Sequence, residues 1–422
     1  MLPLQSPLEA YRSDLSRHPN RTDFGRSDTV WLLVAHCLHR LSRAQGEARR
    51  SIAENCASAI GDLACTVAPD TAEEEAMITQ LERLRCALPL IDTQRGAVEL
   101  IDAARVLARQ MGDAGALWLA FSTLGHVRLA APSACPRDIG LAMADQAWVA
   151  RTLGDLDSAD EIYDEVSAAG VRGTEVELVA RALLGKGITA RVRGNYPKAR
   201  KWLREGLEQA QAAGLNDLVG IGHQGLLIAA GTAGDLDTAL VHGWAAYELL
   251  ADDPMRQAEV LINVAQASLD AGQAIAARSG FLASMSRTES PRFRLACLGG
   301  AAVASASVGD VAALEKLAGT AEESLSPSAF PFETAGVLKS LYRAFELVGN
   351  ASRAEDYRLR ARAMARKNGF FEIVLATEAR EAIKPVRSAE PVLSEESWTV
   401  IHSLESIESE PSALALSLTP QD

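Results

Sequence analysis

A short motif that begins with glycine recurs along the chain at intervals of 37 to 40 residues. Asp, Asn or Gln follows the glycine, and alanine usually stands five positions after it, as in Gly194-Asn195 with Ala199. A single unit of this length cannot bury its apolar face alone, so such a repeat restricts the chain to stacked copies of one supersecondary unit. The anchor glycines are Gly154, Gly194, Gly234, Gly272, Gly309 and Gly349, with a degenerate copy at Gly112.

Proline stands 18 residues before four of these glycines, at Pro136, Pro254, Pro291 and Pro331. Proline fits the first turn of a helix, and glycine ends a helix and permits a tight reversal. The Asp or Asn that follows can cap the next helix, and the later alanine lets that helix approach the first closely. The pattern therefore predicts helical hairpins over 136–175, 176–215, 216–253, 254–290, 291–330 and 331–370.

Composition favours helices over strands, because 74 of the 422 residues are alanine and only 5% are aromatic. Apolar residues also recur in steps of three and four, as at Tyr196, Ala199, Leu203 and Leu207. We therefore predict an all-α fold, a right-handed solenoid of helical hairpins.

The repeat marks divide the chain into four parts. The divergent region 1–93 is expected to be a helical cap with helices near 28–44, 47–66 and 71–88. A repeat array over 94–370 follows, and 371–385 is expected to end it. The remainder, 386–422, carries seven acidic residues and one arginine, and its Ser, Glu and Pro content predicts a flexible tail.

Charge and cysteine usage narrow the function classes. The net charge of −13 argues against direct nucleic-acid or membrane-surface binding, which favours a basic excess. The six cysteines are dispersed without a C-x-x-C pair, and the N-terminus lacks the pattern of a secretion signal. We therefore expect a cytoplasmic protein that crosses no membrane.

Catalytic and cofactor motifs are not evident. The sequence contains neither G-x-S-x-G nor a phosphate-binding G-x-x-x-x-G-K-[ST] loop. His36 and His39 lie three apart on one helix face without further metal ligands nearby, while His223 and His242 fall in the two helices of one hairpin. We expect no enzyme activity, no metal and no cofactor.

The hairpins resemble tetratricopeptide repeats. The similarity is best at Gly194-Asn195-Tyr196 with Ala199, and at Leu341 and Phe345 followed by Gly349-Asn350 and Ala354. It covers about residues 95–370. The period near 40 exceeds the family's usual 34 and looks like the repeats of large bacterial signal-transduction regulators.

The resemblance implies that the first helix of each hairpin lines a concave groove, through positions three, six and ten before the anchor glycine. Arginine stands three before Gly112, Gly154 and Gly194. A row of guanidinium groups suits carboxylates or phosphates. The predicted groove residues are Arg109, Trp148, Arg151, Arg191, Gln224, Gln266, Lys339 and Arg343.

Two alternatives stay open for these charges. Arginine in the last turn of a helix also stabilises the negative end of the helix dipole, which needs no ligand. Acidic residues of the tail alternate with Trp398, Val400, Ile401 and Leu404, a pattern typical of segments that fold on binding. The tail is therefore a candidate occupant of the groove, or a solubilising segment that contacts nothing.

The sequence thus predicts a non-catalytic adaptor or scaffold that holds a protein or peptide segment in a preformed groove. Arginines would bind acidic groups of the partner, and Trp148 would supply apolar contact. The alternative is a sensor subunit, in which a peptide or small molecule changes the superhelix and so controls a transcription or signalling partner.

Overall fold

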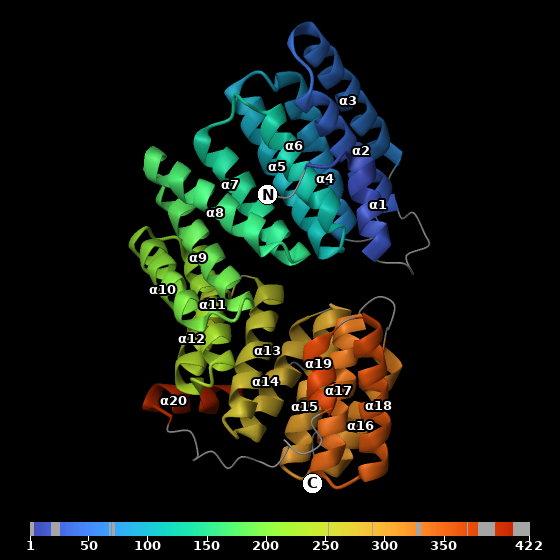
Figure 1. The fold of residues 1–422 in the computed structure, drawn as a ribbon, viewed down its shortest axis with the longest axis vertical. Helices are drawn as coiled ribbons and strands as arrows, with labels where there is room; N and C mark the ends of the chain where they lie inside the picture. The colour runs from blue at the N-terminus through green and yellow to red at the C-terminus, as the bar shows by residue number, and fades with distance from the viewer. Residues whose placement is uncertain are drawn as a thin grey trace. The chain divides into compact units, whose positions relative to one another are not determined.

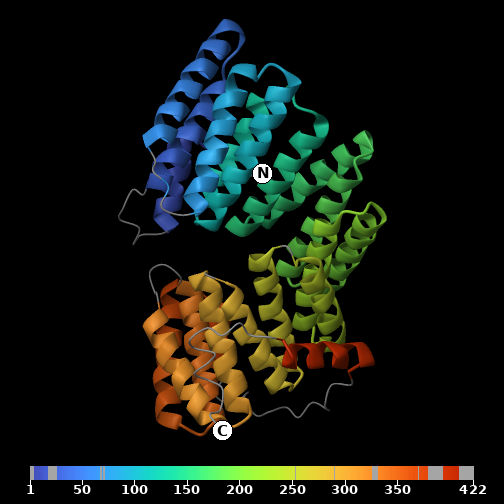
Figure 2. The same ribbon diagram turned by 180° about the vertical axis from the view of Figure 1, so that it is seen from behind.

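The computed structural model describes residues 4–17, 26–66, 69, 72–251, 253–288, 290–325, 331–368, 370–378 and 393–407. Within these residues every regular element is a helix (Figure 1). Within each compact unit, successive helices of the array pack against each other, and each hairpin packs on the next (Figure 2). The prediction of an all-α solenoid of helical hairpins is confirmed.

The chain forms two compact units, Met1–Leu215 and Asn216–Asp422, which divide at a predicted junction between hairpins. Residues on both sides of the predicted 93/94 boundary belong to the first unit, where α4 packs on α5. Its helices are α1 (Pro7–Arg17), α2 (Arg26–Ser42), α3 (Gly46–Thr66), α4 (Ala72–Ala87), η1 (Leu88–Leu90), α5 (Gln94–Asp113), α6 (Leu117–Ala130), α7 (Pro136–Leu153), α8 (Leu156–Gly173), α9 (Val176–Val192) and α10 (Tyr196–Ala212).

The second unit continues the array and adds a separate helix from the C-terminal region. Its helices are α11 (Asn216–Thr232), α12 (Leu236–Leu249), α13 (Pro254–Asp270), α14 (Ala274–Arg287), α15 (Pro291–Ser307), α16 (Val311–Ser324), α17 (Pro331–Leu347), α18 (Ala351–Asn368), α19 (Phe371–Glu378) and α20 (Glu395–Glu405). The four marker prolines are each the first residue of a helix, as the sequence predicts.

A shared turn geometry reverses the chain within each hairpin. Gly154 has φ of 90°, a left-handed conformation that glycine adopts without steric cost. The Asp155 N–H donates to the Ala150 carbonyl at 3.0 Å, and the Asp155 carboxylate accepts from the Ser158 N–H at 2.9 Å. One residue therefore closes the first helix and caps the second. Asn195, Asp235, Asp310 and Asn350 occupy the same place.

The degenerate copy reverses at Gly115 and not at Gly112. Gly112 lies inside α5, whereas Gly115 has φ of 85° and the next N–H, of Ala116, donates to the Met111 carbonyl at 2.7 Å. The anchor predicted from Gly112-Asp113 is wrong by three residues, because the turn residue that follows the true anchor is alanine and hides the motif. Counted from Gly115, Arg109 stands six residues before the anchor glycine and not three.

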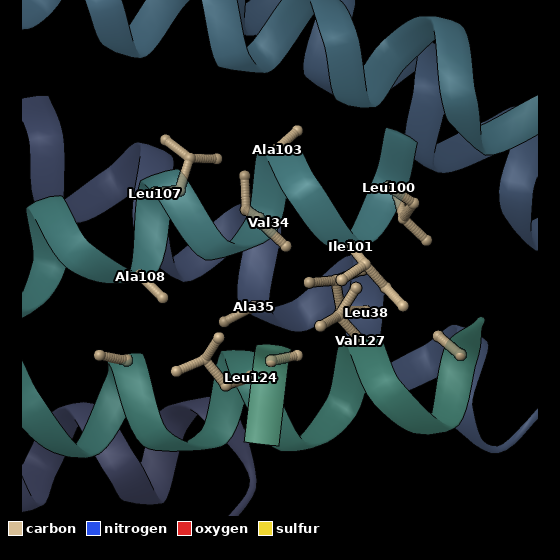
Figure 3. Packing of buried hydrophobic residues seen from close by; sticks show 14 of the residues in the cluster. Val34, Ala35, Leu38, Leu100, Ile101, Ala103, Leu107, Ala108, Leu124 and Val127 are labelled. Atoms are coloured by element: carbon tan, nitrogen blue, oxygen red, sulfur yellow. The ribbon is translucent and has the colours of Figure 1, made fainter. Parts of the chain in front are cut away.

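Alanines and leucines fill the cores between the helices. Figure 3 shows side chains of α2, α5 and α6 meeting in the first unit, among them Val34, Leu38, Ile101 and Leu124. The repeat alanines, for example Ala199, are fully buried, as is Leu314 in the one unit that replaces alanine. First helices of successive hairpins also contact one another, α5 with α7 and α7 with α9, and likewise α11, α13, α15 and α17. They thus form one continuous layer within each unit.

The N-terminal helix α1 is absent from the sequence prediction, because it lacks the repeat marks. It packs on α2 and α6, and the buried Asp14 accepts hydrogen bonds from the N–H groups of Trp118 (2.8 Å) and Leu119 (3.0 Å). Ala116 provides no side-chain cap for α6. Asp14 therefore supplies, from about 100 residues away, the cap that a local Asp or Asn supplies in most other hairpins.

Part of the expected acidic tail is folded. Glu395–Glu405 form α20, which packs on α12 and α14, because its apolar residues fall on one helical face. Residues 379–392 and 408–422, including Glu408 and Glu410, lie outside the described residues.

Replacing Gly154 by alanine forces a Cβ into the left-handed region and should cost about 1–2 kcal/mol. A Cβ at Gly154 meets no atom within 4 Å, so the cost comes from the backbone alone. Urea denaturation should show a lower midpoint for Gly154→Ala. The matched control is Gly319→Ala in α16, where space is also open and φ is helical; its midpoint should stay equal or rise. Equal effects of both changes would contradict a backbone cost specific to Gly154.

Removing the carboxylate of Asp14 should uncap α6 and loosen α1. We expect Asp14→Ala to cost about 1–2 kcal/mol. Hydrogen exchange should accelerate at the amides of Trp118 and Leu119, while Asp62→Ala on the exposed face of α3 should change neither.

Candidate functional site

The eight predicted groove residues fall in both units. Arg109, Trp148, Arg151 and Arg191 lie on α5, α7 and α9 of the first unit. Gln224, Gln266, Lys339 and Arg343 lie on α11, α13 and α17 of the second. Each set belongs to the layer of first helices in its own unit.

Arg109 does not belong to a row with Arg151 and Arg191. It stands six residues before the true anchor Gly115, which is the register of Trp148 before Gly154. Its Nη2 donates to Asp145 Oδ1 at 3.1 Å, and Arg105 Nε donates to Asp145 Oδ2 at 2.6 Å. The buried Asp145 carboxylate therefore compensates Arg109.

Trp148 packs between neighbouring first helices. Its Cη2 lies 2.7 Å from the position that a Cβ on Gly112 would take, so the ring rests where α5 lacks a side chain. The side chain is half-buried and adjoins the core of the first unit. Gly112 thus serves the docking of Trp148 and not the chain reversal.

Arg151 and Arg191 lie near each other at the ends of α7 and α9. Arg151 Nη1 and Arg191 Nε are buried, and the described part of the chain supplies no hydrogen-bond acceptor to either. Burial, and then the positive charge of Arg151, lower the pKa of Arg191. Two like charges with buried, unmade hydrogen bonds are costly, which marks this pair as a place that favours an anion.

Two carboxylates of α8 bind the neighbouring Arg193. Asp160 binds Arg193 through Oδ2, and Asp157 also binds Arg193, at 2.5 Å. The other oxygen of Asp160, Oδ1, is buried without a hydrogen-bond partner among the described residues.

Tyr163 packs against the same hairpin ends. Its ring covers Gly185 of α9 and occupies the space that a Cβ on this glycine would need. Burial raises the pKa of Tyr163, while the charge of Arg151 lowers it. The missing side chain at Gly185 thus lets α8 carry an aromatic ring up to α9.

In the second unit the predicted cations surround an acidic residue. Gln266 Nε2 donates to Asp270 Oδ1 at 3.0 Å on α13. Burial raises the pKa of Asp270, and the Gln266 hydrogen bond and then the charges of Arg343 and Lys339 lower it. Lys339 and Arg343 of α17 therefore lie close to a carboxylate of the chain itself. One carboxylate thus faces the two cations of this cluster.

Asp145 and Asp270 are absent from the residues predicted from the sequence. Each is a lone carboxylate in an alanine-rich stretch of a first helix, and that context was the signal available. Their cationic partners sit on other hairpins, so spacing along one helix gives no indication of these ion pairings.

Histidine pairs form twice. His223 Nδ1 lies 2.9 Å from His242 Nδ1, across the hairpin of α11 and α12. His39 faces His126, with 3.1 Å between Nδ1 and Nε2, and His126 Nε2 is 3.0 Å from the Gln5 carbonyl. No group of three or more His, Cys, Asp or Glu residues suited to a metal ion occurs among the residues described. Gln224, next to His223, is half-buried.

Two further observations concern the described residues. None of the described helices is long and apolar enough to cross a membrane.

A pocket of about 140 Å³ lies at the turn between α17 and α18, lined by residues that include Glu346, Gly349 and Arg358. None of the eight predicted groove residues lines it.

Stability should fall as the pH drops from about 6.5 towards 4. Burial lowers the pKa of His126 and of His223 to about 4. Between pH 4 and the ordinary histidine pKa of about 6.5, the unfolded chain binds protons that the folded chain does not. The stability that these histidines contribute is therefore fully present above this range and is lost as the pH falls through it. Urea midpoints measured from pH 7 to 4 should fall less steeply for His223→Gln. His402→Gln, on the exposed side of α20, should keep the wild-type slope.

No protein-family profile matches this chain, and no curated protein matches it. Among solved structures it is similar to BtubC (BKLC) from P. vanneervenii, with 19% sequence identity and a TM-score of 0.40. The similarity covers 48% of this chain and 85% of that chain. A likeness this distant carries no argument about function, which has to be argued from the residues of the chain itself.

Proposed function

We propose that this chain is a tetratricopeptide-like repeat protein that binds an acidic segment of another protein without catalysis. The observation that supports this most is the uncompensated pair Arg151 and Arg191 on adjacent first helices. Solenoids of helical hairpins offer extended surfaces for such segments. The alternative function, a ligand-responsive sensor, stays a prediction from the sequence.

A partner carboxylate would make the free energy of binding more favourable in two ways. It would pair with the accessible part of the half-buried Arg151 and Arg191 side chains, and it would cancel the repulsion between their charges. Charge-assisted hydrogen bonds of this kind contribute about 1.5–3 kcal/mol each. The half-buried Trp148 stands one helical turn before Arg151 and would contact an apolar neighbour of the acidic residue.

Binding should depend on Arg151 and Arg191 but not on Arg109. We would select 12-residue peptides from a random display library on the full chain, and measure binding of the enriched peptides by fluorescence anisotropy. Enriched peptides should carry Asp or Glu. The double variant Arg151→Gln, Arg191→Gln should bind them about 10-fold or more weakly.

The matched control is Arg109→Gln, since Asp145 already pairs with that arginine. It should bind within about twofold of wild type. The double variant should keep or raise the thermal midpoint, because it removes a repulsion. Undiminished binding by the double variant, or enriched peptides without acidic residues, would refute the proposal. A clear loss of thermal stability would assign the two arginines a structural role instead.

A further inference from the structure

Helix α20 lies across the second helices α12 and α14 in both views (Figures 1 and 2). In the sequence the tail is a candidate occupant of the groove formed by first helices. The described part of the tail binds second helices instead, so a second surface of the unit accepts a helix.

Hydrogen bonds to one carboxylate fix the start of α20. The Ser394 N–H donates to Asp237 Oδ1 at 2.7 Å, and the Ser397 hydroxyl donates to the same atom at 2.6 Å. Ser397 Oγ also lies 3.2 Å from the Asp237 carbonyl oxygen. The Ser397 bond, followed by those of Ser394, lowers the pKa of Asp237 against the effect of burial. Asp237 in the first turn of α12 thus recognises a helix N-terminus.

Apolar residues hold the remainder of α20. Val400, Ile401 and Leu404 are buried in a core shared with α12, α13 and α14. Leu404 Cδ2 lies 3.2 Å from where a Cβ on Gly280 would be, and Ala276 and Ala283 flank that glycine on α14. Small residues about one turn apart therefore open a shallow apolar site, which the large side chains of α20 fill.

The fold of α20 depends on this site. The helix has 11 residues, and isolated helices shorter than about 12–15 residues are marginal in water. Its opposite face, with Glu395, Glu396 and Thr399, is exposed. Being part of the same chain gives this short helix an effective concentration of about the millimolar range.

We propose that the α12–α14 face is a docking site for an amphipathic helix of a protein partner, and that α20 is its intramolecular competitor. The partner helix presents an N-cap hydroxyl residue, whose backbone N–H donates to Asp237, and a second hydroxyl three positions later that donates to the same carboxylate. Large aliphatic residues follow six, seven and ten positions after the first hydroxyl, as Val400, Ile401 and Leu404 follow Ser394. The proposal is independent of Arg151 and Arg191, which lie in the other unit.

The test uses the full chain and a fluorescent peptide of residues 391–407. Leu404→Asp places a carboxylate in the apolar site and displaces α20. This variant should bind the peptide with a dissociation constant in the micromolar range, whereas wild type should bind it at least about 10-fold more weakly because α20 competes. Thr399→Asp, on the exposed side of α20, is the matched control and should behave as wild type.

Peptide variants test the stated chemistry. Ser394→Ala with Ser397→Ala should weaken binding to the Leu404→Asp chain about 10-fold, and a peptide with Leu404→Asp should not bind. Ser397→Glu in the full chain places a second carboxylate beside Asp237. The repulsion between the two carboxylates should displace α20 and so free the site without changing Leu404. Equal binding of the serine and alanine peptides would refute the role of Asp237.

Two results would overturn the proposal as a whole. If Leu404→Asp and Ser397→Glu both unfold the second unit at lower temperature and neither binds the peptide, α20 is a permanent part of the fold. If wild type forms a dimer in sedimentation that Leu404→Asp abolishes, the site belongs to α20 of a second copy and not to a partner protein.

Discussion

Chain reversal at a left-handed glycine is the constraint on which the rest of the structure depends. The N–H after the glycine closes the first helix, and the side chain of the same residue caps the second, as at Gly154 and Asp155. Both helix ends are thereby satisfied within a few residues, so each hairpin needs only its neighbours for apolar burial. First helices then stack as a layer, and second helices remain available on the other side.

Cations in the layer of first helices differ in whether a carboxylate of the same chain lies beside them. The buried Asp145 pairs with Arg105 and Arg109, and the exposed Asp270 lies near Lys339 and Arg343, so both carboxylates act on cations of the fold itself. Arg151 Nη1 and Arg191 Nε are buried without a hydrogen-bond partner among the residues described. The contrast shows that an arginine's place in a repeat carries less information than the acidic residue on the adjacent hairpin.

Local signals made the hairpins predictable, whereas long-range contacts left no local signal. Prolines and glycines mark helix ends through backbone geometry, so helix starts at Pro136 and Pro254 could be read from the sequence. The register at Gly112 failed because Ala116 stands where the capping residue is expected. Helices α1 and α20 were missed because each is short and is stabilised by residues far along the chain, Trp118 and Asp237 among their partners. The approach of Arg151 to Arg191 likewise depends on how two hairpins stack.

The bond between Asp14 and the start of α6 has a consequence for synthesis. Helix α1 is synthesised before α6, and the amides that Asp14 binds are made about 100 residues after it. At translation rates of about 5–20 residues per second, Asp14 waits for roughly five to twenty seconds for the amides that it binds. Nascent chains arrested before residue 117 therefore leave the Asp14 carboxylate without this helix start.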